Sequence, residues 1–273
     1  MLQYDSDFLL EVAESAAEEA GKTLAALFRR RKLSIRRKYD YAGSIVTNAD
    51  LASEKLILSM IRKSGVKSTV VSEEAGRVPF GSGDVTWAVD PLDGTLNFAK
   101  RIPHFAVSIG VRVGGRTVAG AIYDPILEEM FTARRGAGAF LNGRRIRVSS
   151  VTALRNSALI FEWWEPEPSI PDPLGLEKRL YKYTRSLRSP GSIALNLCSV
   201  ASGRFDGMVT VFLRSPIHET LAGSLIVAEA GGRITNSLSE SWESLSRSII
   251  AGGPALHQRL MSFLDQRQRR RSS

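Results

Sequence analysis

Cysteine is almost absent from this chain, and long apolar runs are absent altogether. The single cysteine, Cys198, excludes an internal disulfide and a metal site built from several thiolates. Its apolar, helix-like surroundings predict a buried and inert thiol. No stretch stays apolar for the roughly 20 residues of a membrane-spanning helix, and the N-terminus lacks a signal-peptide pattern. We therefore expect a cytoplasmic protein without a membrane partner.

Histidine is also scarce, and basic residues exceed acidic ones. None of the three histidines lies at metal-ligand spacing from another, and His104 and His257 are interpreted as packing or surface residues. The 37 lysines and arginines against 28 acids give a net charge of +9, which favours an anionic substrate. The arginine clusters at 29–31, 36–37 and 267–271 resemble solvated faces and tails more than a nucleic-acid site. Nucleic acid is thus an unexpected partner, although the basic tail does not exclude it.

The length of 273 residues suits one compact unit or two closely packed subdomains. We expect an N-terminal α+β subdomain over 1–148, a C-terminal α/β subdomain over 149–265 and a disordered basic tail over 266–273. Hydrophobic periodicity predicts the helices, and alternation with turn signals predicts the strands. The expected helices cover about 5–31, 176–187, 193–201 and 219–230, with another from the capping box at 47–50, whose apolar face includes Leu51, and a last one from Pro254. The expected strands cover 68–71, 85–89, 105–113, 117–123, 130–133, 138–141, 158–161, 208–212 and 248–251.

The segment Asp90-Pro91-Leu92-Asp93-Gly94-Thr95 is the most informative part of the sequence. It places two carboxylates close together where an apolar strand is expected to end at a proline. Carboxylates bind hard divalent cations, and backbone N–H groups beside them bind phosphate. The pattern therefore indicates metal-assisted chemistry on a phosphate ester, although Asp-Pro and Asp-Gly are also ordinary turn dipeptides.

The same segment, read on to Phe98, resembles the core motif D-P-[IL]-D-G-T-x-N-F of the inositol monophosphatase family. Further matches in the family's order lie at 45–50, 71–74, 190–203 and 223–232. The resemblance implies the α+β / α/β architecture of that family, a layered αβαβα sandwich. It also implies a magnesium-dependent, lithium-sensitive phosphatase that forms a homodimer.

The resemblance implies a role for each matching residue. Glu73, Asp90, Asp93 and the Leu92 carbonyl would hold a first Mg²⁺, and Asp90, Asp93 and the carboxylate of Glu219 would hold a second; Mn²⁺ is an alternative. Catalysis would use Glu73 and Asp90, with Thr47 and Thr95 as hydrogen-bond partners of the water that Glu73 orients. Asp50 and Glu54 are left open between site residues and capping or surface charges. The expected substrate contacts are Asp93, Gly94, Thr95, Ser192 and Arg214.

The chain departs from the family pattern at three places. His218 and Glu219 stand where the family has tryptophan and aspartate, so the longer Glu219 must reach the metal with an altered geometry. Ser44 replaces a usual aspartate. Phe212 replaces a glutamate that contacts inositol hydroxyls in animal members, and Arg214 nearby suits a more anionic substrate.

These departures leave several functions open. The first is hydrolysis of a sugar or polyol phosphate, inositol-1-phosphate or fructose-1,6-bisphosphate. The second is hydrolysis of NADP or phosphoadenosine phosphate. The third is a catalytically weakened family member that binds RNA or protein. Glu219 and the basic tail suggest this alternative.

Overall fold

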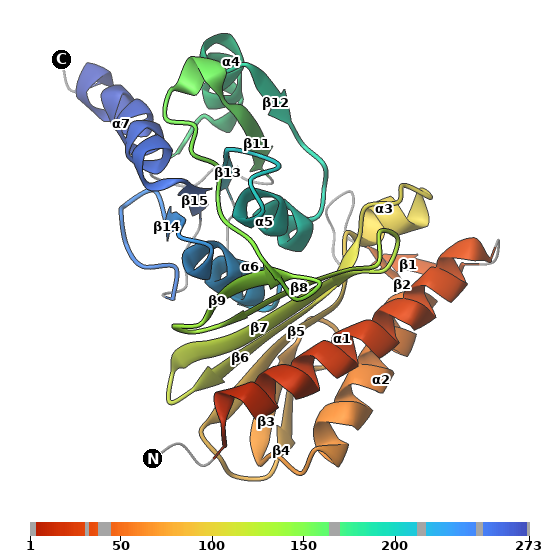
Figure 1. Ribbon diagram of the computed structural model, residues 1–273. Helices are drawn as coiled ribbons and strands as arrows, with labels where there is room; N and C mark the ends of the chain where they lie inside the picture. The colour runs from red at the N-terminus through yellow and green to blue at the C-terminus, as the bar shows by residue number, and fades with distance from the viewer. Residues whose placement is uncertain are drawn as a thin grey trace.

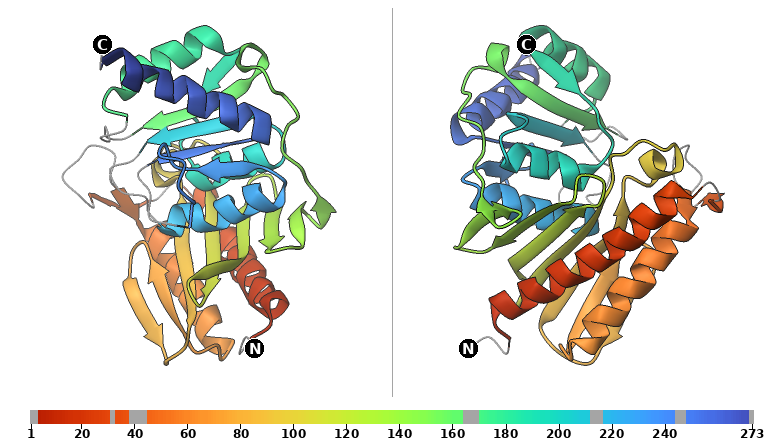
Figure 2. Two further views of the ribbon diagram at one scale, coloured as in Figure 1. Left: turned by 90° about the vertical axis from the view of Figure 1, so that its left-hand side faces the viewer. Right: turned by 45° about the vertical axis from the view of Figure 1, so that its right-hand side comes forward.

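Five layers of helices and sheets alternate through the molecule (Figure 1). The computed structural model describes residues 4–30, 33–37, 45–163, 170–211, 217–243 and 248–271, with the backbone alone from 266 onward. Helices α1 and α2 cover one face of an eight-stranded sheet, and α5 and α6 lie between that sheet and a five-stranded one. Helices α4 and α7 cover the outer face of the second sheet, as the two views of Figure 2 also show. The expected αβαβα sandwich is confirmed. The helices are α1 (Ser6–Arg29), α2 (Asn48–Lys63), α3 (Thr95–Ala99), α4 (Pro173–Tyr183), α5 (Ile193–Ala201), α6 (Ile217–Glu229) and α7 (Pro254–Arg271), with a 3-10 turn at Leu154–Asn156.

The two large sheets come from different halves of the chain. The eight-stranded sheet has the order β10-β9-β8-β7-β6-β5-β3-β4 and is antiparallel except between β3 and β5. The five-stranded sheet has the order β12-β11-β13-β15-β14, with β12, β11 and β13 parallel. A short pair, β1 and β2, precedes α2. The strands are β1 (Ile35–Arg37), β2 (Ile45–Thr47), β3 (Ser68–Ser72), β4 (Gly76–Phe80), β5 (Val85–Asp93), β6 (Ala106–Val113), β7 (Arg116–Asp124), β8 (Glu129–Arg134), β9 (Gly138–Leu141), β10 (Arg144–Arg145), β11 (Ala158–Trp163), β12 (Ser186–Arg188), β13 (Gly207–Val211), β14 (Arg233–Thr235) and β15 (Ser248–Gly252).

Helix α2 begins with the capping box expected from the sequence. The Thr47 side chain accepts from the helix backbone, and the Asp50 carboxylate accepts from the Thr47 backbone. Leu51 was expected on the apolar face, but it is 49% exposed. The buried stripe of this helix instead includes Asp50 and Glu54. Of the alternatives left open for these acids, surface charge is excluded for both, whereas Asp50 does take part in the capping box. Hydrogen bonds compensate their burial: Asp50 accepts from Thr47 and Thr95, and Glu54 accepts from the Ser72 hydroxyl and the Ala75 N–H.

Strand β5 does not end at Pro91. It continues to Asp93, with a register shift in its pairing to β6 between Asp90 and Asp93. Proline is tolerated at a bulge because the bulged residue donates no ladder hydrogen bond. The irregularity therefore lets one strand carry both aspartates of the motif.

The helix expected over 176–187 ends early. Helix α4 ends at Tyr183, where Thr184 closes it by donating to the Leu180 carbonyl, and Ser186–Arg188 form β12. These residues pair with β11, a partner that local sequence does not reveal. At the C-terminus, α7 continues to Arg271, into the segment for which a separate disordered tail was expected.

Two strand glycines bring α6 against the eight-stranded sheet. A Cβ on Gly120 would lie 2.9 Å from the Ala222 Cα, and a Cβ on Gly110 would lie 2.9 Å from the Leu221 side chain. Only a residue without a side chain allows this approach. Because His218 and Glu219 belong to the first turn of α6, the glycines help to set their position over the sheet.

The only cysteine and one of the three histidines are buried. Cys198 is buried, as expected, and burial raises the pKa of its thiol well above the usual value. His257 belongs to α7 and is buried, with its Nε2 2.9 Å from the hydroxyl of Thr235 in β14. Among the described residues, the structure contains no helix long and apolar enough to cross a membrane.

Candidate active and metal site

The end of β5 presents two buried aspartates on a fixed backbone. Asp90 is 1% exposed and accepts a hydrogen bond from the Leu92 N–H at 3.0 Å. Ser53 of α2 donates to the Pro91 carbonyl at 2.6 Å, which ties the bulge to the helix behind it. The motif segment is therefore fixed by a hydrogen bond within it and by another from α2.

Asp93 joins the two halves of the chain. Its carboxylate accepts from the backbone N–H groups of Ile193 at 3.2 Å and Ala194 at 2.9 Å, the first turn of α5. The Ser192 hydroxyl also donates to it. A carboxylate is favoured at a helix N-terminus by these donors and by the helix dipole. Ser192, expected among the substrate contacts, thus has its hydroxyl directed at Asp93.

Glu73 lies just after β3 on a loop that Glu54 fixes. The Glu73 N–H donates to the Val89 carbonyl of β5 at 3.1 Å. Glu54 accepts from the Ser72 hydroxyl at 2.5 Å and the Ala75 N–H at 2.8 Å, on either side of Glu73. Glu54 therefore positions the loop, a role that sequence reasoning left undecided.

Thr95 and Thr47 both contact Asp50. The Thr95 hydroxyl lies 3.0 Å from Asp50 Oδ1 and 3.0 Å from the Leu92 carbonyl. Thr47 contacts the other oxygen of Asp50, through its hydroxyl at 2.6 Å and its N–H at 2.9 Å. Burial raises the pKa of Asp50 to about 6, against hydrogen bonds that lower it. Thr47 and Thr95 thus meet at Asp50, an acid of the motif at 45–50, and their expected contact with the water that Glu73 orients stays a prediction.

Gly94 connects β5 to α3 in a conformation that favours glycine. Its φ is +90°, in the left-handed region, and a Cβ would lie 2.9 Å from the His104 carbonyl oxygen. The backbone can therefore follow this tight path beside Thr95 only without a side chain at position 94.

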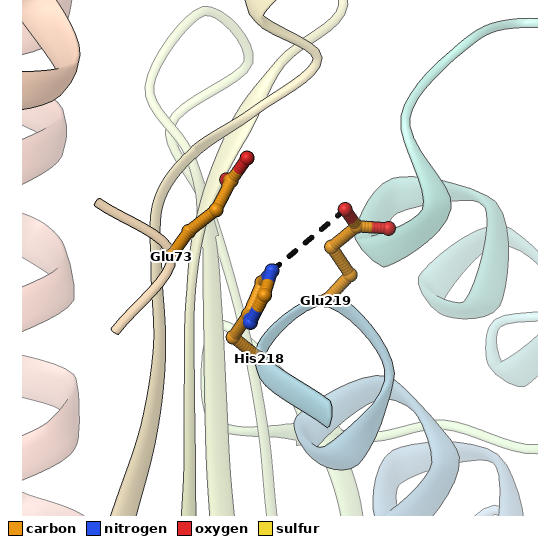
Figure 3. A group of neighbouring side chains, drawn as sticks. All are labelled: Glu73, His218 and Glu219. Carbon is orange, nitrogen blue, oxygen red and sulfur yellow. Dashed lines mark ion pairs between the residues drawn. The ribbon is translucent and has the colours of Figure 1, made fainter. Parts of the chain in front are cut away.

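The first turn of α6 completes the cluster (Figure 3). Ligand atoms of Glu73, His218 and Glu219 all lie within 4.8 Å of one another. From the sequence, His218 was noted only as the residue that stands where the family has tryptophan. In the structure its Nε2 lies 3.9 Å from a Glu219 carboxylate oxygen, and the side chains are 18% and 22% exposed. No histidine spacing along the chain could have revealed this cluster, because Glu73 comes from a distant segment.

The electrostatics of the cluster favour a cation. Burial, followed by the charges of Glu73, Asp93 and Glu219, raises the pKa of Asp90 well above its usual value. Burial also raises the pKa of Asp93 to about 7, although its hydrogen bonds oppose the shift. Four carboxylates that repel one another at a partly buried site match the oxygen ligands that a hard divalent ion prefers. The residues present therefore fit a Mg²⁺ site, with the Leu92 carbonyl beside Asp90 as a further oxygen.

Part of the expected site lies outside the described residues. Arg214 and Phe212, which were expected to influence substrate choice, fall within 212–216, and Ser44 falls within 38–44. Their proposed roles stay predictions.

Comparison with known proteins gives the same family from sequence and from structure. The model of the inositol monophosphatase family matches residues 5–269. Nus factor SuhB of Escherichia coli K12 is 38% identical over 247 residues, covering 90% of this chain and 91% of the relative. Nus factor SuhB of Haemophilus influenzae is 42% identical over 244 residues, covering 89% and 90%.

Solved structures superpose over nearly the whole chain. The crystal structure of the extragenic suppressor protein SuhB from Bartonella henselae has a TM-score of 0.86 at 34% identity, covering 94% of this chain and 98% of that one. The inositol monophosphatase from Anabaena has a TM-score of 0.81 at 32% identity, covering 95% and 96%. Sequence, fold and the acidic cluster agree, and the chain belongs to the inositol monophosphatase family.

Proposed function

We propose that the chain is a metal-dependent phosphomonoesterase that hydrolyses a small sugar or polyol phosphate. Members of the family are generally magnesium-dependent phosphatases. The observation that carries the proposal is the meeting of Glu73, Asp90, Asp93 and Glu219 beside the Asp50–Thr95 pair. These acids come from three separate segments. Their mutual repulsion favours the binding of cations among them.

The carboxylates and the Leu92 carbonyl would hold the metal ions. When bound, two such ions supply positive charge for the attacking and leaving oxygens and lower the pKa of water. Glu73 would orient the attacking water, and the loop contacts of Glu54 keep it in place. Asp93 is held by the first turn of α5, so its carboxylate keeps one orientation through the reaction.

The Asp50–Thr95 pair would accept a proton from the attacking water. Because the Thr95 hydroxyl can donate to Asp50, its oxygen is able to accept a hydrogen bond from water. A carboxyl whose pKa lies at about 6 is suited to accept a proton near neutral pH. The backbone N–H groups of Gly94 and Thr95, beside the pair, would bind the phosphate oxygens. Thr47 would act by fixing Asp50.

The test is phosphate release from a substrate panel. Inositol-1-phosphate, fructose-1,6-bisphosphate, NADP and phosphoadenosine phosphate are each incubated with Mg²⁺, with Mn²⁺ and with EDTA, and Asp90→Asn is the matched control. We expect metal-dependent release from inositol-1-phosphate or fructose-1,6-bisphosphate. Preference for NADP or phosphoadenosine phosphate would instead support the alternative function, a nucleotide phosphatase. If wild type releases phosphate from all four esters no faster than Asp90→Asn, the proposed phosphatase activity is rejected. A homodimer, the expected assembly, is checked by light scattering.

A second candidate is binding to RNA or to a protein of the transcription machinery. It is favoured by the relatives named Nus factor SuhB and by the net charge of +9. Arg36 and Arg37 lie on the exposed strand β1 and add positive charge to the surface. Fluorescence polarisation with single-stranded RNA at several salt concentrations measures this function, because phosphate contacts give an affinity that falls steeply with salt. Affinity that Arg36→Gln and Arg37→Gln leave unchanged would remove these residues from such an interface.

A further inference from the structure

His218 places an imidazole nitrogen among the carboxylates of the cluster. Its ring extends from the first turn of α6 toward Glu219, and Glu73 faces both residues from the loop after β3 (Figure 3). Two elements far apart in sequence thus contribute three potential ligand atoms, one nitrogen and two oxygens, within 4.8 Å of one another.

The spacing suits a shared ion better than a direct hydrogen bond. The 3.9 Å between His218 Nε2 and the Glu219 oxygen exceeds the usual hydrogen-bond range of about 2.7–3.2 Å. Two donors that each lie about 2.1 Å from one ion are separated by roughly 3.0 Å at a right angle and 4.2 Å in line. The observed separation falls between these values, so both atoms can approach one cation with small side-chain movements.

The backbone that carries His218 is held against the sheet. The Ser108 hydroxyl donates to the His218 carbonyl at 3.4 Å, and the first turns of α6 pack on Gly110 and Gly120. The imidazole therefore approaches the cluster from a supported helix rather than from a free loop, which favours a preorganised ligand.

We infer that His218 Nε2 is a metal ligand at the subsite formed with Glu73 and Glu219, and that it makes this subsite prefer Mn²⁺ or Zn²⁺ over Mg²⁺. Mg²⁺ selects oxygen ligands, whereas imidazole suits transition-metal ions. The tryptophan that the family pattern has at this position offers only an N–H donor and cannot bind a cation through nitrogen. The inference rests on the proposed metal-dependent function and adds the class of ion that one of its subsites takes.

Metal binding by the full-length protein tests the inference without relying on turnover. Mn²⁺ is titrated into the metal-free wild type, His218→Gln and His218→Trp and followed by electron paramagnetic resonance; Mg²⁺ and Zn²⁺ are measured by competition. His257→Gln is the matched control, since it removes an imidazole far from the cluster. We expect Mn²⁺ and Zn²⁺ affinity to fall at least about 10-fold in both His218 variants, with Mg²⁺ affinity changed less than about 3-fold. Pulsed measurements on bound Mn²⁺ should show coupling to a nitrogen in wild type and in the control but not in the His218 variants.

The outcomes separate the inference from the proposed function. Equal Mn²⁺ affinity in wild type and His218→Trp, with no nitrogen coupling in wild type, would overturn the role of His218, and metal-dependent phosphate release would then leave the phosphatase standing. A wild type that binds none of the three ions would overturn both. If His218→Gln does not fold, as judged by circular dichroism, His218→Trp decides the question because it installs the residue of the family pattern.

Discussion

Replacing Asp90 by asparagine should stabilise the metal-free protein and abolish most of its activity. Asp90 is buried among Glu73, Asp93 and Glu219, and burial together with their charges raises its pKa well above the usual value. Asparagine has nearly the same shape and keeps an oxygen that can accept from the Leu92 N–H. The substitution therefore removes the repulsion while retaining the local hydrogen bond.

The size of the effect follows from the cost of ionising a carboxyl at this site. Burial beside three other carboxylates makes the ionised form of Asp90 unfavourable, and a buried ion without a counter-charge typically costs several kcal/mol. Structural relaxation and water entry recover part of such a cost, so we expect Asp90→Asn to raise the free energy of unfolding by about 2 kcal/mol. For a chain of this size the melting temperature would rise by roughly 4–8 °C.

The gain should depend on pH in a defined direction. A folded-state pKa above the unfolded value means that wild type loses stability as pH rises, since the unfolded chain ionises first. Below about pH 4 both states of wild type carry the proton and the variant should gain little, whereas near pH 8 the difference should be largest. Added Mg²⁺ should reverse the order, because a ligand at 100 times its Kd stabilises wild type by about 2.7 kcal/mol and the variant binds it poorly.

Differential scanning calorimetry in EDTA and in Mg²⁺, from pH 4 to 8, measures these effects, and phosphate release measures the activity. We expect activity to fall at least about 10²-fold. Asp93→Asn is the control, since its amide nitrogen cannot accept from the first turn of α5, and it should gain no stability. An Asp90→Asn protein that melts below wild type in EDTA at pH 8 would refute the repulsion, and near wild-type turnover at saturating Mg²⁺ would refute the metal site.

Substitutions at three further positions, Glu219, Glu54 and His257, test other contacts. Glu219→Gln should lose at least about 10²-fold in activity and Glu219→Asp should retain or exceed wild type, measured by titrating activity against Mg²⁺; three identical curves would contradict a ligand role. Glu54→Ala leaves the Ser72 hydroxyl without its acceptor and should lower the free energy of unfolding by about 1–3 kcal/mol, with a lower kcat because the loop after β3 loosens; an unchanged melting temperature would argue against this anchor. Burial, and then the charge of Arg233, lower the pKa of His257 from 6.5 to about 4, so the unfolded chain takes up this proton first and stability should fall by up to about 3 kcal/mol between pH 6.5 and 4. In His257→Gln this loss should disappear, and parallel pH profiles of the two proteins would count against it.

Local signals predicted much of the fold. The capping box at 47–50 and the strands over 105–113 and 117–123 were predicted correctly, because each depends on patterns within a few residues. The failures lie where a distant partner decides. Strand β12 forms because its residues, for which a helix was expected, pair with the edge of β11. Strand β5 continues beyond Pro91 because its pairing with β6 shifts register there.

The sequence by itself determined the family and the acids that its motifs contain, since a motif is a linear pattern that can be recognised before the chain folds. Only the tertiary structure decided that Thr95 contacts Asp50, that Glu54 anchors the loop of Glu73, and that His218 enters the carboxylate cluster. These contacts join the ends of strands and helices from different layers. Their distances follow from how the layers pack, down to glycines that let α6 approach the sheet, and no spacing along the chain encodes them.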